Sequence, residues 1–454
     1  MPFISINPFT ENILGDYDTA TDEALFIALN KAEMAQATWR KLPLPARCNY
    51  FSKLATLLIA KYEELAQLAT LEMGKTFAEA KLEVLKCARG CEYYATHSEA
   101  LLASETSKAD TGKTVRVSYE PLGVILGVFP WNFPFWQILR SVIPTVIAGN
   151  AMLVKPAPNV PQCSLAIQQL LQECGLPNDL VQIIFANENQ VAKLIEADGI
   201  KAVTLTGSDR AGSIVASHAA KHIKKSVLEL GGSDPFIVLN DADLDLALEK
   251  AITARFQNNG QSCIAAKRFI LQSNIAAEFT ERLIQLVREL QVGDPLMPQT
   301  NIGPLARKDL QTKLTEQVEQ TVALGANIIY QQNNLPTTGF FYPPTILGNV
   351  PKNSPAYQEE LFGPVITVFV VNQVEEAIQI ANDTSFGLGA SIWSNQVDMA
   401  FEVANRLQCG QVFINEMVKS QPSHPFGGVK KSGYGRELGA YGLKEFCNVK
   451  ALWF

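Results

Sequence analysis

The sequence predicts an α/β protein built on a mostly parallel, doubly wound sheet. Short apolar runs alternate with helix-like segments between residues 124 and 239, and a second alternating section spans residues 269–414. Strand, helix and strand at this spacing is typical of a parallel sheet with helices on both faces. Ligands of such sheets bind at the carboxyl ends of the strands, so we expect the functional residues there.

The chain before the first alternating section is predicted to be mostly helical. A short strand or arm is expected over residues 4–8, followed by turn residues. Apolar residues at helical spacing predict helices over residues 22–41, 46–62, 62–74 and 76–104. Residues 115–119 alternate like an exposed strand, and a turn at Gly123 leads into the first section.

The two alternating sections have these expected elements. Strands are predicted over 124–129, 151–154, 181–185, 202–205 and 235–239, with helices over 137–147, 163–174, 189–196 and 211–222. An amphipathic run follows over 244–256. Later strands are predicted over 269–271, 365–371, 391–393 and 411–414, with helices over 276–290, 306–325, 374–382 and 398–406. Residues 427–442 are rich in turns, and 446–454 are predicted to form a terminal strand.

Composition limits the class of protein. With 454 residues, 47% apolar and 18% charged, the chain is typical of a globular protein of two or three domains. A net charge of −7 argues against nucleic acid or an anionic membrane as the main partner. Eight cysteines without a Cys-x-x-Cys pair indicate neither a zinc ribbon nor a disulfide framework. The N-terminus lacks a signal peptide and residues 142–154 are too short to span a bilayer, so we expect a cytoplasmic protein.

Cys263 is the candidate nucleophile. It lies just beyond Gly260, after the amphipathic run that ends at Phe256. Backbone freedom near a glycine leaves the Cys263 N–H available to a neighbouring oxyanion. A single cysteine is more often an inert buried residue, so its assignment depends on other motifs.

Glu229 is the candidate general base. It ends an apolar strand that runs into Gly231 and Gly232. Partial burial would raise its pKa toward the range of a general base, whereas the alternative is a glutamate on the solvent side of an edge strand. His218 and His222 are spaced like metal ligands on a helix, but no third ligand is nearby in the sequence, so no metal site is expected.

Two strand ends are candidates for binding a dinucleotide. No Gly-x-Gly-x-x-Gly sequence opens a strand–helix unit. Instead, Gly207 and Ser208 end one strand and open a helix whose N-terminus can receive a pyrophosphate, although such turns are mostly structural. Lys155 ends another strand, where its ammonium can hold a ribose or a 2′-phosphate; the alternative is a solvated lysine beside a turn.

Five motifs together resemble one family, the NAD(P)-dependent aldehyde dehydrogenases, from about residue 7 to the C-terminus. The motifs are residues 130–134 (PWNFP), 228–232 (LELGG), 260–263 (GQSC), 359–364 (EELFGP) and 425–430 (PFGGVK). Among these enzymes, the chain is most similar to the shorter succinate-semialdehyde dehydrogenases in its length and in residues 157–160 and 231–239.

The resemblance implies two Rossmann-like doubly wound domains plus a small β hairpin. The cofactor-binding domain would comprise residues 1–102 and 122–231, and the catalytic domain residues 232–442. The oligomerisation element would comprise residues 103–121 and 443–454, from which a homodimer or homotetramer is expected.

The resemblance also implies a mechanism without a metal. Cys263 would attack the aldehyde, and the Asn132 amide with the Cys263 backbone N–H would hold the oxyanion. Glu229 would activate the water that hydrolyses the thioester. The implied cofactor residues are Trp131, Lys155, Gly207, Ser208, Glu360 and Phe362.

Pro158 lies at a position that bears on the choice between NAD and NADP. Many NAD-preferring relatives carry a glutamate at this position, which would repel a 2′-phosphate. Its absence here implies that NADP is accepted, and NAD is not excluded. The expected cofactor is therefore NADP or NAD.

The resemblance implies succinate semialdehyde as the substrate. Arg140 and Ser420 match positions that bind its carboxylate, and Trp136 and Phe426 would supply an apolar wall. Gln257 stands where some relatives have a second arginine, so glutarate semialdehyde or broader aldehydes stay open. Three alternatives remain. Arg140 could be a surface or interface residue, the enzyme could acylate coenzyme A instead of hydrolysing the thioester, or the chain could be a catalytically silent relative.

Overall fold

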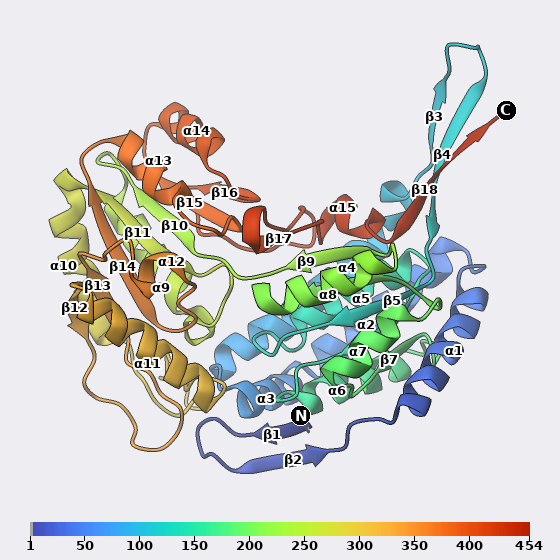
Figure 1. The fold of residues 1–454 in the computed structure, drawn as a ribbon, viewed down its shortest axis with the longest axis horizontal. Coiled ribbons are helices and arrows are strands. Elements are labelled where there is room, and N and C mark those ends of the chain that lie inside the picture. The colour runs from blue at the N-terminus through green and yellow to red at the C-terminus, as the bar shows by residue number, and fades with distance from the viewer. Residues whose placement is uncertain (1–2) are drawn as a thin grey trace.

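The computed structural model describes residues 3–454, and it confirms the predicted α/β architecture with two mostly parallel sheets (Figure 1). At the N-terminus, β1 (Phe3–Ile6) pairs with the antiparallel β2 (Ile13–Tyr17), a strand that the sequence analysis placed among turn residues. The four predicted helices follow as α1 (Asp22–Trp39), α2 (Leu44–Ala60), α3 (Tyr62–Met73) and α4 (Phe77–Leu101).

The first large sheet has six strands in the order β17-β9-β8-β5-β6-β7. Its parallel strands are β5 (Val124–Val128), β6 (Ala151–Lys155), β7 (Val181–Ile183), β8 (Ile200–Thr206) and β9 (Lys225–Glu229). Its helices are α5 (Trp136–Ile147), α6 (Pro161–Glu173), α7 (Glu188–Glu196) and α8 (Asp209–Lys221). The strand order reverses between β5 and β8, and this switch point is where doubly wound sheets bind ligands.

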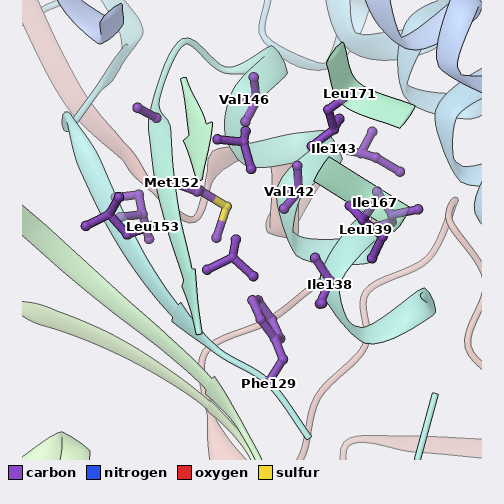
Figure 2. Close-up of a cluster of buried hydrophobic side chains, with 14 of the residues drawn as sticks. Phe129, Ile138, Leu139, Val142, Ile143, Val146, Met152, Leu153, Ile167 and Leu171 are labelled. Atoms are coloured by element: carbon purple, nitrogen blue, oxygen red, sulfur yellow. The ribbon is translucent and has the colours of Figure 1, made fainter. Parts of the chain in front are cut away.

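Side chains from β6, α5 and α6 meet in one buried cluster beside this sheet, as Figure 2 shows. Ile138, Leu139 and Val142 of α5 pack here, and each buried aliphatic side chain contributes about 1.5–3 kcal/mol. On β5, a side chain at Gly127 would lie 2.4 Å from the ring of Phe129, so the glycine makes room for that ring. This packing fixes the start of α5, which carries several candidate site residues.

The second large sheet has seven strands in the order β12-β13-β14-β11-β10-β15-β16, of which only β12 is antiparallel to its neighbour. The strands are β10 (Asp234–Val238), β11 (Ala266–Gln272), β12 (Asn327–Gln331), β13 (Thr345–Gly348), β14 (Val365–Val371), β15 (Gly389–Trp393) and β16 (Gln411–Ile414). The helices are α9 (Leu244–Phe256), α10 (Ser273–Glu289), α11 (Lys308–Ala323), α12 (Pro355–Gln358), α13 (Val374–Asn382) and α14 (Val397–Arg406). No pattern in the sequence predicted β12, β13 or α12.

A small third sheet projects from the body of the molecule (Figure 1). It has the order β18-β4-β3, with β3 (Glu105–Lys108), β4 (Thr114–Pro121) and the C-terminal β18 (Cys447–Trp453). The predicted terminal strand therefore pairs with the predicted hairpin, from Cys447 opposite Pro121 to Trp453 opposite Val115.

The turn-rich stretch after β16 returns the chain to the first sheet. It contains a 3-10 turn (Lys430–Ser432), β17 (Gly433–Tyr434) and α15 (Gly439–Lys444). β17 pairs with β9 and places Gly433 opposite Glu229. Residues near the C-terminus thus come to lie beside the candidate general base.

Candidate active site

A pocket of about 560 Å³ lies at the carboxyl ends of the first sheet's strands. Trp131 and Asn132 follow β5, Gly207 follows β8, and Gly231 follows β9. The second large sheet contributes Cys263 and, from the loop before β14, Glu360 and Phe362. The pocket therefore joins predicted site residues from sequence positions as far apart as 131 and 362.

Cys263 is positioned by a left-handed loop. α9 ends at Phe256, and Asn258, Asn259 and Gly260 follow with φ values of 57°, 57° and 73°. A side chain at Gly260 would lie 2.5 Å from the Gly363 carbonyl carbon, so only glycine fits this close approach. The glycine is needed four residues after Phe256, the last residue of the helix.

Two buried cations hold the loops around Cys263, and the sequence analysis missed both. The Arg255 guanidinium donates to the carbonyl oxygens of Val365 at 2.7 Å and Leu361 at 3.0 Å, which ties α9 to the loop before β14. The Lys267 ammonium donates to the carbonyl oxygen of Cys263 at 2.9 Å and pairs with Glu360 at 3.3 Å. These contacts fix the backbone on both sides of the thiol.

The Cys263 thiol is neutral in this environment. Its side chain is partly exposed to the pocket. Burial raises the pKa of the thiol to about 12, while the charges of Arg140 and Lys267 oppose the rise. The two cations are therefore the groups that favour the reactive thiolate.

The Asn132 side chain faces the same pocket as Cys263. Its Nδ2 group donates to the Gln261 carbonyl oxygen at 3.0 Å, which leaves one amide hydrogen for another acceptor. The same carbonyl accepts a hydrogen bond from Asn258 Nδ2 at 2.9 Å. The amide is thus oriented by the loop that carries the thiol.

Glu229 lies beside the pocket residues but does not line the pocket. It is the last residue of β9, is 2% exposed, and neither carboxylate oxygen has a hydrogen-bond partner within residues 3–454. A side chain at Gly427 would approach Glu229 Oε1 to 2.7 Å, so this glycine gives the carboxylate its space. Burial raises its pKa well above the usual value, and Glu437 adds to the rise against Arg140. The alternative of a solvent-facing glutamate is wrong.

The pocket wall suits a nicotinamide dinucleotide. The Trp131 and Phe362 rings meet edge to face at 5.7 Å, and the Glu360 carboxylate accepts a hydrogen bond from Gly232 N at 3.1 Å. A side chain at Gly207 would have only Leu205 within 4 Å, so the turn before α8 is open toward the pocket. A helix N-terminus that faces a pocket can receive a phosphate.

Lys155 and Pro158 lie at the carboxyl end of β6, outside the residues that line the pocket. The Lys155 ammonium is 5.7 Å from the centre of the Phe3 ring, and burial lowers its pKa. Lys155 is half-buried rather than fully solvated.

Arg140 lies behind the pocket, on α5. It is 3% exposed, so the surface or interface alternative is wrong for this chain. Its guanidinium pairs with Glu437 at 2.6 Å, donates to Thr206 Oγ1 at 3.2 Å, and lies 5.1 Å from the centre of the Phe426 ring. Thr206 lines the pocket, which connects Arg140 to it through one hydroxyl.

Trp136 and Ser420 come together through Lys86, a residue that the sequence analysis did not single out. The Lys86 ammonium donates to Ser420 Oγ at 2.6 Å and lies 4.5 Å from the centre of the Trp136 ring. Trp136, Ser420 and Phe426 are all buried, and none of them lines the pocket. The only sequence signal for Lys86 was a lysine within a predicted helix.

Comparisons with known proteins identify relatives over the full chain. The family model described as "Aldehyde dehydrogenase family" matches residues 2–452. A probable succinate-semialdehyde dehydrogenase, NADP(+), from Synechocystis sp. is 47% identical over 100% of both chains. The succinate semialdehyde dehydrogenase, NAD(P)+, Sad from Escherichia coli is 43% identical over 99% of this chain and 97% of the relative.

A solved structure has the same fold. The succinic semialdehyde dehydrogenase from Streptococcus pyogenes, in complex with NADP+ as the cofactor, has a TM-score of 0.97 and 36% identity, and the match covers 100% of this chain and 99% of that one. Within residues 3–454, no helix is both long and apolar enough to cross a membrane.

Proposed function

Because the chain belongs to the aldehyde dehydrogenase family, we propose that it oxidises succinate semialdehyde to succinate with NADP or NAD. The relatives at 43–47% identity carry that activity in their names. The proposal rests on one observation above the others: Cys263 and Asn132 line the same pocket as Gly207 and Glu360. A nucleophile, an amide donor and a wall suited to a dinucleotide thus share one space.

In the first half of the reaction, the Cys263 thiol gives up its proton to solvent, and the thiolate adds to the aldehyde carbon and forms a carbon–sulfur bond. The new alkoxide accepts hydrogen bonds from the Asn132 amide and from the Cys263 backbone N–H. Hydride would leave the same carbon, and a nicotinamide held at the pocket wall would supply the acceptor for it. The alkoxide collapses to a thioester on Cys263.

In the second half, Glu229 takes a proton from water, and the resulting hydroxide attacks the thioester carbon. The carbon–sulfur bond breaks, succinate leaves, and the Cys263 sulfur is released for another turnover. Glu229 must lose its proton before it can act, and burial opposes that loss. Hydrolysis should therefore accelerate as the pH rises.

The cofactor and the substrate would occupy opposite sides of Cys263. The nicotinamide and pyrophosphate would be held by Trp131, Gly207, Ser208, Glu360 and Phe362. The adenosine end would lie against Lys155 and Pro158. On the substrate side, Arg140 and Ser420 would attract the carboxylate, and Trp136 and Phe426 would contact the methylene chain. NADP is favoured because Pro158 presents no carboxylate to a 2′-phosphate.

Steady-state kinetics over a panel of aldehydes with both cofactors tests the proposal. We expect kcat/KM for succinate semialdehyde to exceed that for butanal, which has the same number of carbons, by at least tenfold. Glutarate semialdehyde belongs in the panel as the longer competitor. Added coenzyme A should not yield an acyl-CoA product. Equal kcat/KM values for butanal and succinate semialdehyde would refute the substrate assignment.

Arg140 needs a paired design. Arg140→Met alone leaves Glu437 buried without its partner, which typically costs 3–5 kcal/mol of stability. The double variant Arg140→Met/Glu437→Gln removes both charges. If Arg140 attracts the substrate carboxylate, the double variant loses more kcat/KM for succinate semialdehyde than for butanal, whereas Glu437→Gln alone keeps most of the preference; an equal loss with both aldehydes would contradict this role.

The two large sheets and the small sheet β18-β4-β3 suggest the domain organisation and assembly. We propose a cofactor-binding domain (residues 1–102 and 122–231), a catalytic domain (232–442) and an oligomerisation element (103–121 and 443–454). β18 is an edge strand with Val449 and Trp453 each about 60% exposed, a surface suited to a second copy. Val449→Lys/Trp453→Lys should shift the molar mass measured by light scattering toward that of the monomer.

A further inference from the structure

Lys86 is a mostly buried cation without an anionic partner. It lies on α4 and forms no ion pair with any acidic group within residues 3–454. The nearest acidic residue along the helix, Glu83, is already committed. Its carboxylate pairs with Lys75 and accepts hydrogen bonds from the backbone N–H groups of Phe135 and Trp136, both at 2.9 Å.

The groups that contact the Lys86 ammonium are a hydroxyl and an aromatic ring, neither of which carries a negative charge. Its ammonium donates to the Ser420 hydroxyl at 2.6 Å and rests on the Trp136 ring at 4.5 Å, which leaves donor capacity unused. Charged groups that face it are Arg140 of α5 and, on α4 itself, Glu83 and Arg89. Burial and, to a lesser extent, the charge of Arg140 lower the pKa of Lys86 to about 8, as expected for a cation lacking a counter-charge.

Arg140 differs from Lys86 because it already has an anionic partner. Its guanidinium is held by Glu437 and Thr206, so its charge is largely compensated inside the protein. Lys86 and Arg140 both contact aromatic rings of the predicted substrate wall, Trp136 and Phe426 respectively. Of the two cations, Lys86 is the one whose charge remains uncompensated.

We propose that Lys86, together with the Ser420 hydroxyl, binds the terminal carboxylate of a short carboxylated aldehyde and thereby selects such substrates over neutral ones. The inference rests on the proposed aldehyde oxidation and names a specificity-determining residue for it. An ammonium–carboxylate hydrogen bond in a site shielded from water is worth about 10- to 100-fold in selectivity.

The test compares kcat/KM for succinate semialdehyde with kcat/KM for butanal in Lys86→Met, Lys86→Gln and Lys86→Arg. We expect the ratio to fall about 10- to 100-fold in Lys86→Met and Lys86→Gln, and to stay within about fivefold of wild type in Lys86→Arg. Lys81→Met is the matched control, because Lys81 also lies over an aromatic ring on α4 but pairs with Glu63 at the surface. Its ratio should not change.

Inhibition by succinate gives a second readout that does not depend on oxidation of the carboxylated substrate. Succinate should inhibit butanal oxidation competitively, and its inhibition constant should rise in Lys86→Met by the same factor as the ratio falls. Two variants that remove the charge keep the test decisive if one of them does not fold.

The possible outcomes separate this inference from the proposed function. If wild type shows no preference for the carboxylated aldehyde, the proposed substrate is wrong. If wild type shows the preference and both uncharged variants retain it within threefold, the role of Lys86 is refuted. A parallel loss with both aldehydes, at constant ratio, would make Lys86 a structural residue and would likewise overturn the inference.

Discussion

Replacing Asn132 with alanine should slow hydride transfer by about 100- to 1,000-fold and leave the fold intact. The loss of one donor to a developing oxyanion costs about 2.7–4 kcal/mol of transition-state stabilisation, which corresponds to that factor in rate. The structural cost is smaller. The Gln261 carbonyl would lose the Asn132 donor at 3.0 Å but keep the Asn258 donor at 2.9 Å, so about 0.5–1.5 kcal/mol of stability is at stake.

Single-turnover formation of the reduced cofactor, followed by absorbance with enzyme in excess, separates hydride transfer from thioester hydrolysis. Asn258→Gly measures the contribution of the loop, because it removes the other donor to Gln261 and a donor to the Asn132 carbonyl at 2.8 Å, and glycine accepts the left-handed φ of 57°. We expect this variant to lose less than tenfold in the single-turnover rate. If Asn132→Ala keeps more than a tenth of the wild-type rate, or if Asn258→Gly loses as much, the oxyanion assignment is wrong.

Three further predictions concern the base, the substrate cation and the loop. Glu229→Gln should lower steady-state kcat by about 10²–10⁴-fold but still give a first-turnover burst of reduced cofactor. Acylated Cys263 should then be detectable by intact-protein mass spectrometry. Absence of a burst would contradict the role of Glu229 as the base for thioester hydrolysis. The preference for a carboxylated over a neutral aldehyde should decline above pH 8, because Lys86, with a pKa of about 8, loses its positive charge there. If the wild-type preference does not change between pH 7 and pH 9, the role of Lys86 is contradicted. Gly260→Ala should lower the free energy of unfolding by about 2–5 kcal/mol, because the φ of residue 260 is 73° and the new Cβ would clash with Gly363. The loss should appear as a lower midpoint of urea unfolding. An unchanged midpoint would show that the loop relaxes around the alanine.

The sequence predicted the buried parallel strands because such strands are continuous apolar runs between turn residues. It did not identify β2 and β12, where Ile13 and Ile328 are 68% and 45% exposed. Both are edge strands whose conformation depends on pairing with a neighbour, a contact that no local pattern encodes. β13 is buried, but its apolar run consists of Ile346 and Leu347 alone, between Thr345 and Gly348, which is too short to indicate a strand.

The candidate site was predictable where motifs carry it, and less so where buried charges support it. Cys263, Asn132 and Glu360 were selected from their motifs, and all three line one pocket. Arg255 and Lys267 were not identified, because their only signal was a charged residue inside an apolar segment. Arg255 binds backbone carbonyls about 110 positions away, a partner set that only the folded chain defines.

Arg140 acts on several groups at once, which argues for a separate substrate cation. Burial raises the pKa of both the Cys263 thiol and the Glu229 carboxyl, and Arg140 opposes each rise while pairing with Glu437. A carboxylate placed directly on Arg140 would neutralise this influence and move both pKa values further from the reactive range. Seating the carboxylate on Lys86 avoids that conflict, because Lys86 is not among the charges that shift either reacting group. The two cations would then act separately, with Lys86 binding the substrate and Arg140 favouring the thiolate while attracting the carboxylate at longer range.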